Sequence, residues 1–200
     1  MRKIGLFGGT FNPIHNGHVR LLNSVMEKIE FDEVIVMPSK IPPHKVAQNL
    51  VSGKDRSEMC RLAFEDNKKV TVSDYELKRR GKSYSVYTLR HLNKLYPEDR
   101  IYFIMGSDML LCFDKWYRYE ELLERTSLVC ISRDDEDTKE KLTACAEALR
   151  EKGGEVILLD TEPYELSSTE VRERLQKSLD CSCYLPQKIV QYICGKNLYK

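Results

Sequence analysis

Short apolar runs alternate with longer amphipathic stretches along the 200 residues of this chain. Several of the runs are almost continuously apolar, which is typical of parallel strands that are buried on both faces. Their regular alternation with helical patterns predicts an open parallel α/β sheet with right-handed crossovers and helices on both faces. The predicted strands are Lys3–Phe7, Glu33–Met37, Val70–Ser73, Arg100–Met105, Ser127–Ile131 and Glu155–Leu159.

The stretches between and after these runs predict six helices, because apolar residues recur in them three and four positions apart. Pro97, the Gly153-Gly154 pair and Gly195 follow three of these helices, at positions where such residues commonly end a helix. No internal repeat or low-complexity linker interrupts the pattern, so we expect one domain over residues 1–200. The predicted helices are Gly17–Ile29, Asp55–Asp66, Tyr84–Leu95, Thr138–Lys152, Ser168–Gln176 and Pro186–Cys194.

The overall charge and hydropathy exclude several classes of partner. The formal net charge is +1, so no global field attracts nucleic acid or anionic lipid. No apolar run is long enough for a membrane span or a signal peptide, and the chain has seven cysteines without a CxxC pair. We therefore expect a cytoplasmic protein that binds neither nucleic acid nor membrane. A homo-oligomer is compatible with the sequence.

Zinc is not expected at Cys181, Cys183 and Cys194, which are interpreted as small buried apolar residues.

Residues 7–18, FGGTFNPIHNGH, connect the first predicted strand to the first predicted helix. Ligands of open α/β sheets bind outside the carboxyl ends of the strands, where this stretch lies. Gly8 and Gly9 lack Cβ atoms, so a phosphate can approach their backbone N–H groups closely. The start of the helix at Gly17 and His18 adds free N–H groups and a favourable dipole for an anion.

Two histidines, His15 and His18, lie three residues apart within this stretch. A metal site would need a third ligand, and the neighbouring asparagines are not strong ones. Packing or helix capping is the structural alternative. A phosphate role suits the rings better, because each imidazole can donate a hydrogen bond to an oxygen on which charge builds in a transition state.

A second stretch with similar chemistry, LSSTEVR, occupies residues 166–172. Ser167 or Ser168 can cap the helix that follows, and the hydroxyls and free N–H groups there favour an anion. Arg172 lies one turn inside that helix and can pair with a phosphate. The GKS at residues 81–83 is not a phosphate-binding P-loop, because Glu76 stands where such a loop requires glycine.

Together, HNGH at residues 15–18 and SSTEVR at residues 167–172 resemble the two signatures of the nucleotidyltransferase superfamily. Nearly the whole chain is similar to bacterial nicotinate-nucleotide adenylyltransferases, through PSKIPPHK at 38–45, ELKRRGKSYSVYTL at 76–89, FIMGSDMLLCFDKW at 103–116 and YLP at 184–186. The resemblance implies a Rossmann-like fold in which the helical part from about residue 166 to 200 completes an ATP site. Asn12 departs from the aspartate that is frequent in this family.

The resemblance also implies which residues hold each substrate. Asp108 would bond an adenosine ribose hydroxyl or cap the helix after it, and Arg133 matches an ATP-contacting arginine of the family. The implied ATP-binding residues are Gly8, Gly9, Thr10, Phe11, Gly106, Asp108, Arg133, Ser167, Ser168 and Thr169.

For the acceptor, the resemblance implies that Trp116, the only tryptophan, stacks on the pyridine of nicotinate mononucleotide. The alternative is an ordinary core or surface aromatic residue. Backbone amides near Ser85 and Tyr117 would hold the nicotinate carboxylate, and Lys45 would meet the phosphate. Lys40 and His44 are weaker candidates for that phosphate.

The implied reaction is adenylyl transfer from ATP to nicotinate mononucleotide, giving nicotinate adenine dinucleotide and pyrophosphate in NAD biosynthesis. His15, His18 and Arg172 would stabilise charge on the reacting phosphates, and Mg²⁺ would bind mainly phosphate oxygens. Two alternatives are a pantetheine-phosphate adenylyltransferase, which shares both signatures, and a non-catalytic nucleotide-binding regulator on the same fold.

Overall fold

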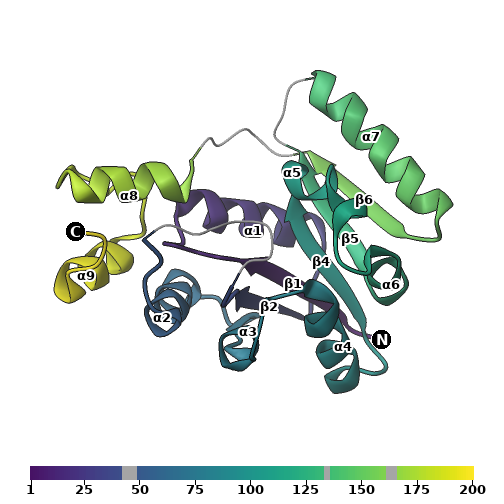
Figure 1. Cartoon of the computed structure of the whole chain (residues 1–200), viewed down its shortest axis with the longest axis horizontal. Coiled ribbons are helices and arrows are strands. Elements are labelled where there is room, and N and C mark those ends of the chain that lie inside the picture. The colour runs from purple at the N-terminus through teal and green to yellow at the C-terminus, as the bar shows by residue number, and fades with distance from the viewer. Residues whose placement is uncertain (42–48, 133–135, 161–165) are drawn as a thin grey trace.

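A sheet of six parallel strands forms the centre of the molecule (Figure 1). The computed structural model describes residues 1–41, 49–132, 136–160 and 166–200. Every predicted strand is confirmed, with its bounds within two residues of the expected ones, because runs that are buried on both faces are easily recognised in sequence. The strands are β1 (Lys3–Gly9), β2 (Glu33–Pro38), β3 (Val70–Val72), β4 (Arg100–Gly106), β5 (Ser127–Ser132) and β6 (Glu155–Asp160).

All six predicted helices are present in the described chain, and three short α-helices and a 3₁₀ turn join them. The end predicted for the last helix is wrong: the helix continues through Gly195 to Lys196, and its C-cap Asn197 takes the left-handed conformation with φ 51°. The helices are α1 (Asn16–Lys28), α2 (Gly53–Phe64), α3 (Tyr75–Lys78), α4 (Ser85–Leu95), α5 (Ser107–Leu110), η1 (Phe113–Lys115), α6 (Tyr119–Arg125), α7 (Glu136–Glu151), α8 (Ser168–Gln176) and α9 (Gln187–Lys196).

Two hydrophobic cores lie on opposite faces of the sheet. One contains apolar side chains of α4, α6 and α7, such as Leu89, Leu122 and Leu142. The other contains side chains of α1, α2, α8 and α9, such as Leu22 and Ile189. Figure 1 shows α8 and α9 at one end of the molecule, next to α2, with α6 and α7 at the other end. The second core therefore brings the last two helices to the same face as the first two.

The strand order, β3-β2-β1-β4-β5-β6, reverses direction between β1 and β4. The chain runs outward from β1 to β3, returns to β4 beside β1, and then runs outward to β6. A crevice opens at such a switch point, outside the carboxyl ends of the two central strands. The ends of these strands are Gly9 and Gly106, so two of the predicted nucleotide-binding segments border the switch point.

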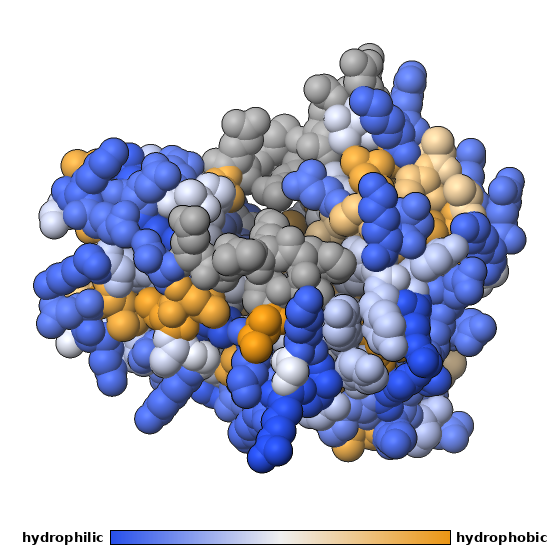
Figure 2. Space-filling model, viewed as in Figure 1, coloured by the Kyte–Doolittle hydropathy of each residue, from blue (hydrophilic) through white to orange (hydrophobic). Residues whose placement is uncertain are grey.

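The surface is mainly polar. Figure 2 shows hydrophilic residues over most of one face, with apolar colour concentrated in a few patches. No helix in the described ranges combines the length and apolar character that a membrane span requires. All seven cysteines lie in described residues and are free, but only one of the three C-terminal cysteines fits the predicted burial: Cys181 is buried, whereas Cys183 and Cys194 are exposed. Cys183 lies in a connection, and Cys194 lies on the outer side of α9.

Candidate active site

Gly8 and Gly9 are the last residues of β1, so the strand extends two residues further than the sequence predicts. A Cβ at Gly9 would lie 2.7 Å from the ring of Phe11, and a Cβ at Gly8 would lie 3.7 Å from Phe103. The chain turns back sharply at Phe11, whose φ is 48° and whose ring packs 5.4 Å from that of Phe7. A side chain at Gly9 would therefore have to displace the buried ring of Phe11, so the packing here favours glycine.

His15 and His18 lie at the start of α1, where the predicted stretch places them. Their rings are 3.7 Å apart, and His15 is almost fully buried. The backbone N–H of His15 donates to Nδ1 of His18 over 3.3 Å. Because Nδ1 accepts this bond, a neutral His18 carries its proton on Nε2. The Phe11 ring packs edge-on against His18 at 5.2 Å and fixes the orientation of the imidazole.

The free N–H groups that the sequence predicts at the start of α1 are partly used within the protein. The N–H of Asn16 donates to the carbonyl of Tyr184, and the N–H of His18 donates to the carbonyl of His15, each over 2.9 Å. The side-chain amide of Asn16 also donates to the carbonyl of Cys183 over 3.0 Å. The residues before α9 therefore cover part of this helix terminus. The histidine rings remain the main anion donors that this segment offers.

The two signature stretches, about 150 residues apart, are in direct contact. Arg172 donates from Nη1 to the carbonyl of Asn12 over 2.9 Å, and Ser168 donates from Oγ to the carbonyl of Pro13 over 3.0 Å. Arg172 also donates from Nη2 to Oγ1 of Thr169 over 3.1 Å. The guanidinium of Arg172 thus lies against the loop between Gly9 and His15. Hydroxyls, imidazoles and a guanidinium gather at one place, which is the donor set that a polyphosphate requires.

Ser167 is the N-cap of α8, as one of the two sequence alternatives predicts. Its Oγ accepts a hydrogen bond from the N–H of Glu170 over 3.1 Å. Ser168 is the first helical residue and instead bonds the loop after β1. The two serines therefore have different roles. Ser167 caps the N-terminus of α8, and Ser168 joins this helix to the loop of the first signature.

At the end of β4, Gly106 is the N-cap of α5, and Asp108 is exposed in the first turn of this short helix. A Cβ at Gly106 would meet no atom within 4 Å, so open space lies in front of this residue. The structure places both residues next to the switch point. Arg133, His44 and Lys45 lie outside the described residues.

The residues predicted for the acceptor meet on the other side of β4. Trp116 is 9% exposed, and its ring packs 5.3 Å from Phe113 and 5.9 Å from Phe103. Phe103 is also the neighbour of Gly8, so it links the tryptophan to the end of β1. In this arrangement most of the indole belongs to the core, and stacking on a ligand would use the small part that is exposed.

Ser85 and Tyr117 are brought close to each other by a cluster of tyrosines. Ser85 is the first residue of α4, and its predecessor Tyr84 packs 4.8 Å from the ring of Tyr117. A hydrogen bond with Arg118 is the main cause that lowers the pKa of the Tyr117 phenol. The ammonium of Lys40, a weaker candidate for the acceptor phosphate, is bonded within the protein: its Nζ donates to the carbonyl of Arg79 over 3.1 Å.

Two buried charged residues near this region were not predicted. Arg56 in α2 is 1% exposed, and it donates to backbone carbonyls of both loops that follow β1 and β2. Glu76 is 7% exposed and accepts a hydrogen bond from Thr88, while burial raises the pKa of its carboxyl. The signal for Arg56 was present, because it lies three and four positions before Met59 and Cys60 on the apolar side of α2.

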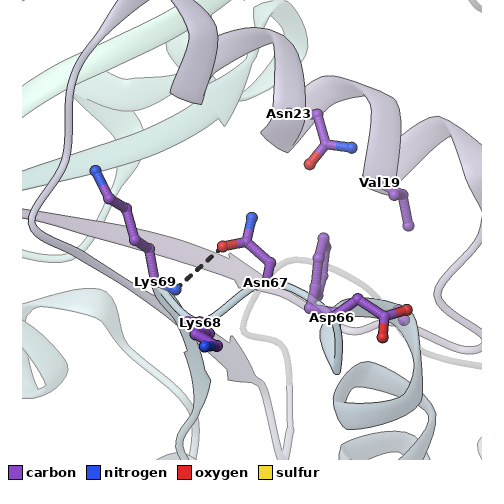
Figure 3. Close-up of a pocket in the computed structure, with 8 residues that line it drawn as sticks. Val19, Asn23, Asp66, Asn67, Lys68 and Lys69 are labelled. Carbon is purple, nitrogen blue, oxygen red and sulfur yellow. Dashed lines mark hydrogen bonds between the residues drawn. The ribbon is translucent and has the colours of Figure 1, made fainter.

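No group of three or more His, Cys, Asp and Glu side chains that could hold a metal ion occurs in the part of the chain that the structure describes. A pocket of about 510 Å³ opens elsewhere, between α1 and the segment that joins α2 to β3 (Figure 3). Val19, Asn23 and residues 66–69 form part of its lining, and none of the predicted site residues does. The candidate active site is the group of side chains at the switch point, where the loop after β1 contacts α8.

Comparison with known proteins identifies the family and the fold. Residues 6–174 match the model of the cytidylyltransferase-like family, a range that includes both signature stretches. The chain is similar to two solved structures of the Plasmodium falciparum nicotinic acid mononucleotide adenylyltransferase, one complexed with APC and one with NaAD. Their TM-scores are 0.77 and 0.78 at 21% identity, and each comparison covers 100% of this chain and 98% of the other. These likenesses establish the fold.

Sequence relatives are more similar than these structures. Proteins named probable nicotinate-nucleotide adenylyltransferase are 36% identical in Lactococcus lactis, 34% in Clostridium tetani and 38% in Shewanella pealeana. The alignments cover 99 to 100% of this chain and 96 to 100% of the relatives. Both the family model and these full-length similarities include the residues that build the crevice. The chain thus belongs to the cytidylyltransferase-like family and, within it, to the bacterial nicotinate-nucleotide adenylyltransferases.

Proposed function

We propose that this protein transfers the adenylyl group of ATP to nicotinate mononucleotide, releasing pyrophosphate and forming nicotinate adenine dinucleotide. The observation that carries the proposal is the contact between Arg172 and the carbonyl of Asn12, which joins two anion-binding segments at the switch point. The full-length relatives in three bacteria support the choice of substrates, since their names specify a nicotinate nucleotide.

The chemistry requires no protein nucleophile, because the phosphate of the mononucleotide is already an anion. One of its oxygens attacks the α-phosphorus of ATP in line, and the bond from that phosphorus to the pyrophosphate oxygen breaks. Negative charge moves onto the pyrophosphate and is spread over the oxygens of the transferring phosphorus. Catalysis then consists of positioning the two substrates and stabilising this charge.

His18 suits the stabilising role because its Nδ1 accepts a bond from the backbone of His15. This contact leaves Nε2–H as the donor toward a phosphate oxygen, and the buried ring of His15 holds the imidazole of His18 in place. We assign Arg172 to the same charge, since its guanidinium lies against the loop that precedes the histidines.

The remaining candidate groups would hold ATP. Ser168 and Thr169 lie beside Arg172 at the start of α8, and Gly8, Gly9, Thr10 and Phe11 line the end of β1. Since the described residues contain no cluster of metal ligands, Mg²⁺ would arrive with ATP, bound mainly to phosphate oxygens. When bound, it would neutralise part of the polyphosphate charge.

The acceptor would bind on the opposite side of β4, where Trp116, Ser85 and Tyr117 meet. The backbone amides near the start of α4 and at Tyr117 would receive the nicotinate carboxylate.

The free thiols of all seven cysteines support a cytoplasmic location, where thiols are kept reduced.

Pyrophosphate release tests the proposal. The protein is incubated with ATP and Mg²⁺ and with either nicotinate mononucleotide or phosphopantetheine. Release with the mononucleotide alone supports the assignment. Release with phosphopantetheine alone would overturn the proposed acceptor, and no release with either would overturn the catalytic function in favour of a nucleotide-binding regulator.

A further inference from the structure

A buried arginine lies beneath the loops of the candidate site. Arg56 is 1% exposed, and its Nη1 donates to the carbonyls of Thr10 (2.6 Å) and Ser39 (2.8 Å). Its Nε donates to the carbonyl of Val51 over 3.3 Å. These carbonyls belong to the loop after β1, the loop after β2 and the residues before α2. One guanidinium therefore holds three separate segments together.

Burying a charged guanidinium away from water costs free energy of folding. Burial of a guanidinium lowers the pKa of Arg56, and no carboxylate within the described ranges forms an ion pair with it. The hydrogen bonds described for its guanidinium all go to backbone carbonyls. A residue that served only to fill space here would be apolar, so the cost indicates that the orientation of these carbonyls matters.

The bond to Thr10 fixes the direction of one peptide group. In a trans peptide the carbonyl and the following N–H point in opposite directions. Because the carbonyl of Thr10 is turned toward Arg56 in the interior, the N–H of Phe11 points away from Arg56. Phe11 belongs to the segment assigned to ATP. The buried arginine thus sets the orientation of a backbone donor at the end of β1.

Asn12, the next residue, connects this loop to the segment before α2 and to α8. Its Nδ2 donates to the carbonyl of Asn49 over 3.1 Å, and its Oδ1 accepts from the N–H of Val51 over 3.3 Å. Its own carbonyl accepts the bond from Arg172. An ionised aspartate could not donate to Asn49, so this connection requires the amide of Asn12.

Tyr199 completes the arrangement from beyond α9. Its ring is 7% exposed, and its hydroxyl donates to Oδ1 of Asn12 over 2.9 Å. Burial raises the pKa of this phenol far above its ordinary value, although Arg56 and Arg172 act in the opposite direction. The hydroxyl therefore stays protonated and acts as a donor. Tyr199 and Arg172 therefore both bond Asn12, one at its side chain and one at its backbone carbonyl.

We propose that Arg56, Asn12 and Tyr199 form a positioning network for adenylyl transfer. They hold the backbone from Thr10 to Asn12 and, through the carbonyl of Asn12, the guanidinium of Arg172. None of the three is assigned to contact a substrate. The proposal rests on the proposed function, and it locates the effect at the ATP end of the site, because the acceptor residues lie across β4.

Tyr199→Phe tests the network by removing one hydroxyl and nothing else. We expect kcat to fall about fivefold to tenfold, the effect of one misplaced hydrogen bond on a preorganised site. The KM for nicotinate mononucleotide should stay unchanged. The matched control is Tyr192→Phe, because the hydroxyl of Tyr192 in α9 donates to Asp55 of α2 and not to Asn12. Steady-state kinetics and the melting temperature are measured for both variants.

The control should lose stability without losing kcat. Equal loss of kcat in the two variants, or an unchanged kcat in Tyr199→Phe, would overturn the network. An inactive wild-type protein would instead overturn the proposed function, so the two failures are distinguishable.

Arg56→Lys and Arg56→Met form a second pair. A lysine can still donate to Thr10 or Ser39, whereas methionine leaves the buried carbonyls without a donor. We expect lysine to retain more of kcat than methionine at equal saturation with nicotinate mononucleotide. Equal kcat in both variants would overturn the role of Arg56, and if Arg56→Met does not fold, the tyrosine pair alone decides the proposal.

Discussion

The imidazole of His18 has its tautomer set by one backbone group, the N–H of His15. This contact matters because a histidine that donates from Nε2 stabilises negative charge without first taking up a proton. Its neighbour Phe11 and the ring of His15 restrict the imidazole on two sides. The sequence predicts the pair of histidines and their phosphate role, but the ring contacts depend on the turn at Phe11, which no spacing of residue types reveals.

His18→Ala should lower kcat by about a hundredfold or more, because it removes a preorganised donor to charge that develops in the transition state. The melting temperature serves as a control for folding. Steady-state kinetics with saturating ATP and nicotinate mononucleotide measure the effect, and an unaltered kcat would reject the assigned role.

Trp116→Ala should chiefly raise the KM for nicotinate mononucleotide rather than the KM for ATP. The indole is mostly buried against Phe103 and Phe113, so the variant also loses about 3–5 kcal/mol of stability. Trp116→Phe is the control, since it keeps an aromatic ring in the core. A rise in the KM for ATP instead would show that the ring does not serve the acceptor.

At the scale of single elements, the six strands and the long helices could be predicted because burial dictates their pattern. The short helices could not. The sequence YEELLER of α6 covers only 7 residues, and it begins after Arg118 in the left-handed conformation, which a Gly or Asn would have signalled but an Arg does not. Arg56 was missed for a related reason: a charged residue on an apolar helix face is ordinarily assigned to solvent.

One carboxylate links α4 to α6 in addition to their apolar contacts. Glu121 accepts two hydrogen bonds from Arg90, at 2.6 and 2.7 Å, and one from Arg125 at 2.8 Å. The hydrogen bond from Arg90 is the main cause that lowers the pKa of Glu121 to about 2. Ser85 is the first residue of α4 and Tyr117 lies two residues before α6, so this carboxylate helps to set the spacing between them.

Glu121→Gln should destabilise the protein at neutral pH. Because the folded pKa lies below the unfolded value of about 4.3, the carboxylate stabilises the fold above that pH and loses this effect as the pH falls toward 2. Urea unfolding of wild type and variant from pH 7 to pH 3 measures the difference, which should shrink with acid. Exposed Glu124→Gln is the control, and a difference that does not change with pH would contradict the prediction.

At the scale of the whole molecule, the crevice is built from both halves of the chain. α1 supplies the histidines, α8 supplies Arg172, and α8 and α9 lie together at one end of the sheet (Figure 1). The sequence could predict that the two signatures cooperate, since one anion needs both. The sequence could not predict the hydrogen bond from Tyr199 to Asn12, because no sequence pattern indicates which distant residue a single tyrosine will contact.

ATP with Mg²⁺ should slow amide hydrogen exchange in α8 more than in α6. A ligand that bridges the two signatures stabilises the docking of α8, whereas α6 makes no predicted contact with ATP. Exchange is measured by mass spectrometry with and without nucleotide, and the Arg172→Met variant should show less protection. Equal protection of both helices would indicate that ATP does not bind at α8.

The contact of Arg172 with Asn12 also has a consequence for the synthesis of the chain. A ribosome adds about 5–20 residues per second, so His15 and His18 leave it on the order of ten seconds before Arg172 does. During that interval the histidines lack their partner guanidinium. A nascent chain that stops at β6 also lacks the apolar side chains of α8 and α9 that complete one of the two cores, and it should be unable to use ATP. Activity begins only with the last helices.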